Sequence, residues 1–154
     1  MTLTQTTRII EQVAAQQPAV NMIVRNDIFR LNGFPNARYG VFGWLQGRHT
    51  SDLDAGLRRF RYTLFYVDRL TADKGNELEV QSVGIVTLEN IVAKLADAGI
   101  YADGEVEFQS FNQRFVDECA GVYCTLALQV PAEGICGEEY TDFNDDFNDD
   151  FLIL

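Results

Sequence analysis

The chain has 154 residues, of which 47% are hydrophobic and 23% are charged. This balance is typical of one soluble globular domain that can bury a real core. The formal net charge of -11 argues against sequence-specific nucleic-acid binding, because phosphate contacts need a basic face. No apolar run approaches the length of a membrane span, and the first residues lack the layout of a signal peptide. We therefore expect no membrane partner, and a protein that stays in the compartment where it is made.

The N-terminal part of the chain is expected to begin with a helix. Residues 3–17 carry apolar side chains on one narrow face, and Pro18 follows the run. Thr4 or Thr6 can cap the start of this helix. Asn21–Leu31 fits neither the helical nor the strand period, so it is either a strand or a short helix.

A glycine-containing strand and a polar loop are expected next. Tyr39–Leu45 predicts a strand, and Gly40 and Gly43 within it indicate a bend or a close backbone approach. Gln46–Leu57 is polar throughout most of its length and is expected to be a flexible loop.

Arg58–Arg69 predicts the central strand of a sheet, because β-branched and aromatic residues dominate it. Alternation separates its side chains into two faces. The first face contains Phe60, Tyr62, Leu64 and Tyr66, and the second contains Arg59, Arg61, Thr63, Phe65 and Val67. Both faces are partly apolar. We therefore expect a helix on one face and a neighbour, such as another subunit, on the other.

The C-terminal half predicts one long helix and two strands. Glu77–Ala98 has apolar residues at three-to-four spacing, and Gly99 can end the helix. The expected stripe consists of Leu78, Val83, Val86, Ile91, Val92 and Leu95. Glu105–Ser110 and Val122–Val130 alternate strictly and predict strands. Their connection is long for a tight hairpin, and it carries Arg114, Asp117, Glu118 and Gly121.

This order of elements predicts the α+β class. We expect a mostly antiparallel sheet with an N-terminal helix and one long helix packed on it. Residues 1–137 form a single domain in this interpretation, and residues 138–154 form a separate C-terminal arm.

The residues suited to catalysis are few, and we expect no enzyme. The single histidine, His49, could pair with Asp52 or Asp54, but a polar loop of this kind is usually just solvated. Asp117–Glu118 beside Arg114 is best explained as a surface network of ion pairs. No phosphate-binding glycine motif is present in the sequence, so no nucleotide cofactor is expected.

The three cysteines predict no metal site. Cys119, Cys124 and Cys136 form no CxxC pair, and the one histidine is far away in the sequence. We interpret them as reduced thiols, with Cys124 in the core.

The C-terminal arm has an unusual composition. Glu138–Leu154 contains seven acidic residues and no Lys or Arg, and phenylalanines recur in it every four residues. One interpretation is a disordered, solubilising acidic tail. The favoured one is a docking arm that inserts apolar side chains into a groove of a partner. Its candidate partner-binding residues are Phe143, Phe147, Phe151, Leu152, Ile153 and Leu154. Calcium binding is a third option, although the glycine and terminal glutamate of an EF-hand loop are missing.

The segment FNQRFVDECAGVYCTLALQVP, residues 111–131, continues into VPAEGICGEEY. It resembles the closing region of tail-terminator (tail completion) neck proteins of tailed bacteriophages. The similarity is to proteins from phages that infect Bacteroides-like hosts, such as crAss-like phages. The expected element order over residues 1–140 is also similar to that family. The resemblance implies a non-enzymatic virion protein, assembled in the host cytoplasm, that forms a homo-oligomeric ring of about six or twelve copies at the head–tail junction. Its further partners would be neck, connector or tail-tube proteins.

A ring of this kind predicts which residues meet between subunits. The expected contacts come from the central strand and the polar loop before it. They comprise His49, Asp52, Asp54, Arg58, Arg59, Arg61, Tyr62 and Tyr66. The alternative is a small α+β protein-binding or regulatory module whose acidic, Phe-rich tail docks on a basic or apolar partner.

Overall fold

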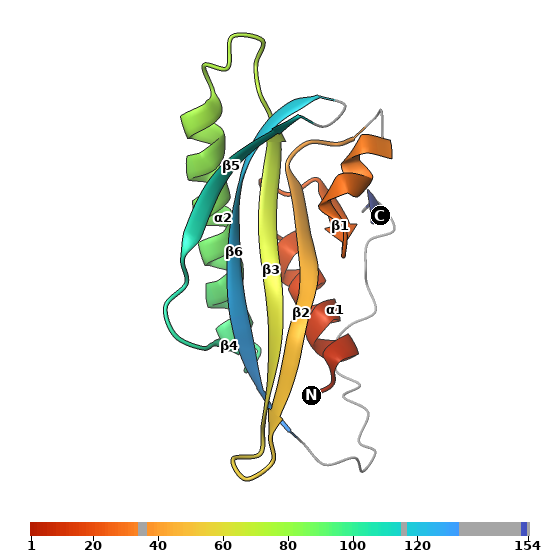
Figure 1. The fold of residues 1–154 in the computed structure, drawn as a ribbon, viewed down its shortest axis with the longest axis vertical. Helices are drawn as coiled ribbons and strands as arrows, with labels where there is room; N and C mark the ends of the chain where they lie inside the picture. The colour runs from red at the N-terminus through yellow and green to blue at the C-terminus, as the bar shows by residue number, and fades with distance from the viewer. Residues whose placement is uncertain (34–36, 115–116, 133–151, 154) are drawn as a thin grey trace.

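The computed structural model describes residues 1–33, 37–114, 117–132 and 152–153 (Figure 1). It has the expected α+β fold, with a mostly antiparallel sheet, an N-terminal helix and one long helix. The elements in chain order are α1 (Leu3–Ala15), β1 (Met22–Arg25), the 3-10 helix η1 (Ile28–Gly33), β2 (Val41–Asp52), β3 (Leu57–Arg69), α2 (Glu77–Asp97), β4 (Tyr101–Ala102), β5 (Phe108–Arg114), β6 (Glu118–Pro131) and β7 (Leu152–Ile153).

Strand β3 is central to the sheet, as its composition predicts. It pairs antiparallel with β2 on one side and, along its whole length, with β6 on the other. The strand order is β4-β6-β3-β2-β1-β7, and β5 pairs with another part of β6. Only the β1–β2 and β1–β7 pairs among these are parallel.

Helices α1 and α2 cover one face of the sheet (Figure 1). The alternation predicted for β3 is confirmed. Phe60, Tyr62, Leu64 and Tyr66 are buried against the helices, whereas Phe65 and Val67 join a second, smaller core on the opposite face. We call this opposite face the second face.

Helix α1 begins one residue after its cap. The cap is Thr2, not Thr4 or Thr6, because its hydroxyl accepts the Gln5 amide at 3.2 Å. The Gln5 side chain accepts the Thr2 amide at 2.8 Å in return, which completes a capping box.

Helix α2 presents a different face to the sheet than its apolar pattern predicts. Leu78, Val83 and Val86 are 78%, 38% and 54% exposed, so their assignment to the buried stripe is wrong. The buried face passes instead through Gly84, where an added Cβ would lie 3.0 Å from Cδ1 of Tyr66. This side of α2 faces the sheet because Gly84, which has no side chain, lets the helix backbone come close to the Tyr66 ring of β3.

Two segments of the N-terminal half differ from the expectation. Gln46–Leu57 is not a loop, because β2 continues to Asp52 and β3 begins at Leu57, with one bulge between Gln46 and His49. Polar residues can form strands here because both faces of this hairpin are largely exposed. Asn21–Leu31 contains both the strand β1 and the start of η1.

Strands β5 and β6 are longer than expected, and the connection between them is shorter. Strand β5 covers Phe108–Arg114, not Glu105–Ser110, and its last residue pairs with Glu118. The expected long connection is therefore mostly strand. Strand β5 pairs with β6 alone among the described strands, so it lies at an edge of the sheet, where polar residues are tolerated.

Candidate interaction surface

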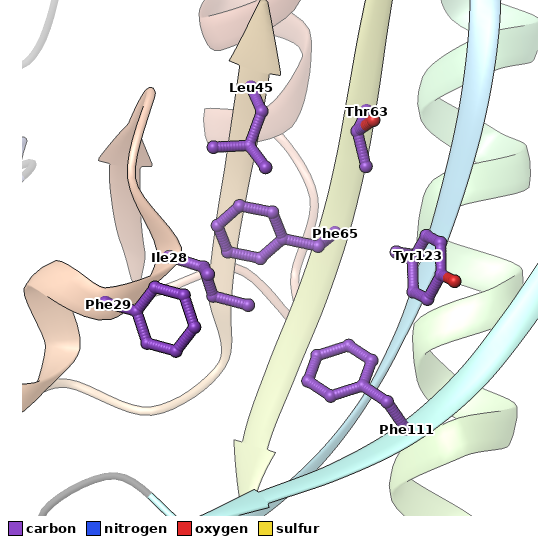
Figure 2. A pocket seen from close by; sticks show the side chains of 7 residues that line it. All are labelled: Ile28, Phe29, Leu45, Thr63, Phe65, Phe111 and Tyr123. Carbon is purple, nitrogen blue, oxygen red and sulfur yellow. The ribbon is translucent and has the colours of Figure 1, made fainter.

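The second face of the sheet carries a groove lined mainly by apolar side chains (Figure 2). We call it the aromatic groove, and its volume is about 260 Å³. It is lined by Ile28 and Phe29 of η1, Leu45 of β2, Thr63 and Phe65 of β3, Phe111 of β5 and Tyr123 of β6. Strands β2 and β3 form its floor, while η1 and the β5–β6 pair stand on either side. At its rim Phe29 is 59% exposed.

Two strand glycines allow the aromatic rings to lie flat on the sheet. A Cβ at Gly43 would be 2.0 Å from Cζ of Phe65, and a Cβ at Gly121 would be 2.6 Å from Cζ of Phe111. Each ring therefore occupies the space that a side chain on the neighbouring strand would fill. At Gly43 the expected close approach is made by the Phe65 ring and not by backbone. Gly40, just before β2, has a positive φ of 66° and marks the predicted bend.

The second face becomes polar from Thr63 of the groove lining onward. The hydroxyls of Thr63 and Thr125 are 2.9 Å apart across β3 and β6. The Arg61 side chain lies against Gly47, where an added Cβ would be 3.1 Å from its Cγ. Arg59 donates from Nε to the Asp103 carboxylate at 3.2 Å. One continuous face thus combines an apolar groove with nearby positive charge.

A second groove, of about 580 Å³, lies between α1 and the β1–β2 edge. At its base the Glu11 carboxylate is buried and accepts two hydrogen bonds of 2.6 Å from Arg25. It also accepts the Trp44 indole N–H at 2.9 Å. The hydrogen bond to Glu11 raises the pKa of Arg25. Because these donors satisfy the carboxylate, we interpret the cluster as structural. Sequence reasoning missed it, although a glutamate next to Ile10 on the apolar face of a helix is a usable signal.

Two residues expected at a subunit contact are inside the chain's own core. Tyr62 and Tyr66 are fully buried beneath the helices, and burial raises the pKa of both phenols. The Tyr62 hydroxyl lies 2.7 Å from the Thr7 hydroxyl. These two tyrosines therefore expose no area to a neighbour, and we remove them from the predicted interface.

The remaining expected contact residues lie along the β2–β3 hairpin. Arg58 is half-buried and donates to the Met1 carbonyl at 3.0 Å, while Arg61 is exposed. His49 packs edge-on against Phe60, with ring centroids 5.4 Å apart. The Nδ1 atom of this histidine is buried and makes no hydrogen bond among the described residues.

The hairpin tip exposes an apolar side chain. Asp52 accepts the Ala55 amide at 3.0 Å and so stabilises the turn, whereas Asp54 points to solvent. Leu53 between them is 86% exposed. The imidazole of His49 packs on the Phe60 ring, whereas Asp52 accepts a hydrogen bond within the turn. His49 and Asp52, which were considered as a catalytic pair, therefore contact different parts of the hairpin.

The acidic pair at the start of β6 takes part in surface ion pairs, as expected. Asp117 accepts from Arg69 at 2.9 Å and from the Tyr39 hydroxyl at 3.1 Å. Glu118 lies 3.5 Å from Lys74. The described partners are Arg69 and Lys74, and the side chain of Arg114 is outside the described part of the chain.

The described thiols are core residues. Cys119 and Cys124 are buried and free, which confirms the expectation for Cys124, and Cys136 lies outside the described residues. Burial raises the pKa of Cys124 to about 12. Within the described ranges, no group of three or more His, Cys, Asp or Glu side chains could hold a metal ion. The described helices include none with the length and apolar character needed to cross a membrane.

Only a short part of the arm is described. Leu152–Ile153 forms β7, which pairs in parallel with Met22–Ile23 of β1. Phe143, Phe147, Phe151 and Leu154, which were expected to bind a partner, lie outside the described residues. The end of the arm is thus placed at the edge of the chain's own sheet.

Comparison with known proteins finds no family model that matches the sequence and no matching curated protein. The structure places the chain in the α+β class.

Proposed function

We propose that this protein is a non-enzymatic structural subunit that forms a homo-oligomeric ring at the head–tail junction of a tailed bacteriophage. In this role it joins the tail to the capsid as a neck or tail-terminator protein. The resemblance of residues 111–131 to the closing region of such proteins suggests the class. The structural observation that carries the proposal is the outer face of α2.

The outer face of α2 carries three exposed aliphatic side chains among polar residues such as Glu79, Ser82 and Glu89. Leu78, Val83 and Val86 are exposed on it, while Val80, Leu88, Ile91 and Leu95 of the same helix are buried on the sheet. Single exposed aliphatic residues are common on monomers, but three on one side of one helix favour a protein contact.

A closed ring needs two different contact surfaces on each subunit. Each copy meets one neighbour through one patch and the other neighbour through a second patch. The α2 outer face and the β2–β3 hairpin tip with Leu53 lie on different parts of the molecule (Figure 1). They therefore suit a head-to-tail arrangement, with His49, Asp52, Asp54 and the exposed Arg61 near the hairpin contact.

The test is the particle mass and shape of the full chain by native mass spectrometry and negative-stain imaging. We expect a closed ring for the natural sequence. Val86→Asp should break the ring, because it places a carboxylate in the contact. Ser110→Asp adds the same charge on the exposed edge strand β5 and should leave the ring intact. A natural chain that stays monomeric at all concentrations contradicts the proposal.

The aromatic groove favours a second candidate, a small protein-binding or regulatory module. A groove of this size suits side chains of a peptide better than a second folded domain. This alternative predicts a monomer or dimer that binds a basic or apolar partner through its arm. The same mass measurement separates the two candidates.

A further inference from the structure

We propose that the aromatic groove is the docking site of the chain's own C-terminal arm, residues 138–154, and that Phe143 enters it. This inference holds whether or not the protein forms a ring. It assigns an occupant to the open apolar surface of the second face that Ile28, Phe65 and Phe111 help to form.

The groove has the size and chemistry of a side-chain receptor. Its volume of about 260 Å³ is below the roughly 300–1,000 Å³ that small-molecule sites occupy. Its wall on the β5–β6 side consists of the half-buried rings of Phe111 and Tyr123, and the buried Phe65 ring lies at its floor, which favours an aromatic guest. The arm carries phenylalanines at 143, 147 and 151, which give a solvated tail no advantage.

The C-terminal end of the arm is anchored close to the groove. Strand β7 lies on β1, so β3 at the groove floor is three strand positions away, which is about 15 Å. Phe143 is nine residues before Leu152 and can span about 30 Å, enough to pass around η1. Phe151 directly precedes Leu152 and cannot cover this distance.

The other end of the arm allows the same placement. Tyr123 in the groove precedes Pro131 by eight residues of β6, a distance of about 27 Å. Phe143 lies eleven residues after Ala132, and this stretch can extend over about 37 Å. The chain on either side of Phe143 is therefore long enough for Phe143 to reach the groove. Because the arm is attached at both ends, its effective concentration at the groove is high.

Charge also favours this occupant. Phe143 is flanked by Asp142, Asp145 and Asp146. Arg30 is exposed beside Phe29 on η1, and exposed Arg61 lies two residues along β3 from Thr63. Carboxylates of the arm can face these arginines while the ring enters the groove, which fixes the register of docking.

The experiment uses the full chain with p-benzoylphenylalanine in place of Phe143, irradiated and mapped by peptide mass spectrometry. The chain is mixed with a nitrogen-15-labelled copy, so that cross-links within one chain differ in mass from those between chains. We expect cross-links within one chain to peptides that contain Ile28, Phe29, Phe65, Phe111 or Tyr123. The same probe in place of Phe151 should give none of them.

A matched pair of groove variants completes the test. Thr63→Glu puts a carboxylate into the groove and should lower the cross-link yield about tenfold or more. Thr125→Glu breaks the same threonine–threonine hydrogen bond outside the groove lining and should leave the yield unchanged. Cross-links from position 143 to other surfaces, or only between chains, overturn the proposal. An unchanged yield in Thr63→Glu does so as well. Ring formation is read separately from particle mass, so the two proposals fail independently.

Discussion

Replacing Arg25 by alanine is expected to destabilise the fold more than neutralising its partner Glu11. The two side chains share two hydrogen bonds of 2.6 Å, but their surroundings differ. The Glu11 side chain is 4% exposed and the Arg25 side chain is 46% exposed. After the loss of its partner, Arg25 can turn to water, whereas Glu11 cannot.

The magnitudes follow from this asymmetry. Among the described residues, Arg25→Ala leaves the buried Glu11 carboxylate with the Trp44 indole N–H as its hydrogen-bond donor. Removing one partner of a buried pair costs about 3–5 kcal/mol. Glu11→Gln keeps an acceptor for Trp44 and loses the charge-assisted contacts of a half-exposed arginine. We expect it to lower the free energy of unfolding by about 1–2 kcal/mol.

The assay is urea unfolding of the full chain and both variants at neutral pH. Arg69→Ala serves as the control, because it removes a charge pair with Asp117 whose arginine is largely exposed. Surface pairs of this kind contribute about 0–1 kcal/mol. If Arg25→Ala is no more damaging than Glu11→Gln, or matches Arg69→Ala, the assignment of Glu11 as a buried structural anion is refuted.

Three further predictions concern stability. Gly121→Ala should lower the free energy of unfolding by about 2 kcal/mol or more, because the new Cβ would meet the Tyr66 carbonyl oxygen at 2.5 Å and the Phe111 ring; thermal melting against the natural chain measures it. Thr2→Ala removes the cap of α1 and should lower the same free energy by about 1 kcal/mol, read from urea unfolding. Burial raises the pKa of Cys124 from 9.0 to about 12, so the unfolded chain ionises first and stability falls above pH 9 by about 1.4 kcal/mol per pH unit. Unfolding of Cys124→Ala across pH 8–11 should show a shallower fall, and an identical slope contradicts this linkage.

Local patterns predicted the strands that are surrounded by other strands. The alternation from Phe60 to Val67 assigned each β3 side chain to the correct face, because the pleat places successive residues on opposite sides whatever the neighbours are. The same rule placed Cys124 in the core. Helix α2 was found as an element, but its rotation was not, since Leu78 and Val86 are as apolar as the residues that pack.

The candidate interaction surface is harder to predict from the sequence than the strands are. The aromatic groove draws its lining from η1, β2, β3, β5 and β6, and no short-range pattern brings Phe29, Phe65 and Phe111 together. Gly43 was recognised as a close approach, but its partner ring comes from the neighbouring strand. The polar composition of Gln46–Leu57 predicts a loop, whereas cross-strand pairing makes this segment part of the sheet.

By itself the sequence determined the α+β class, the central strand with its two faces, and an acidic arm with regularly spaced phenylalanines. These features depend on residue order within one element, where backbone geometry sets the period. Only the tertiary structure decided which side of α2 packs, which tyrosines are hidden, and that Glu11 meets Arg25 and Trp44. It also decided that the arm ends beside β1, because strand pairing joins residues that are far apart in the chain.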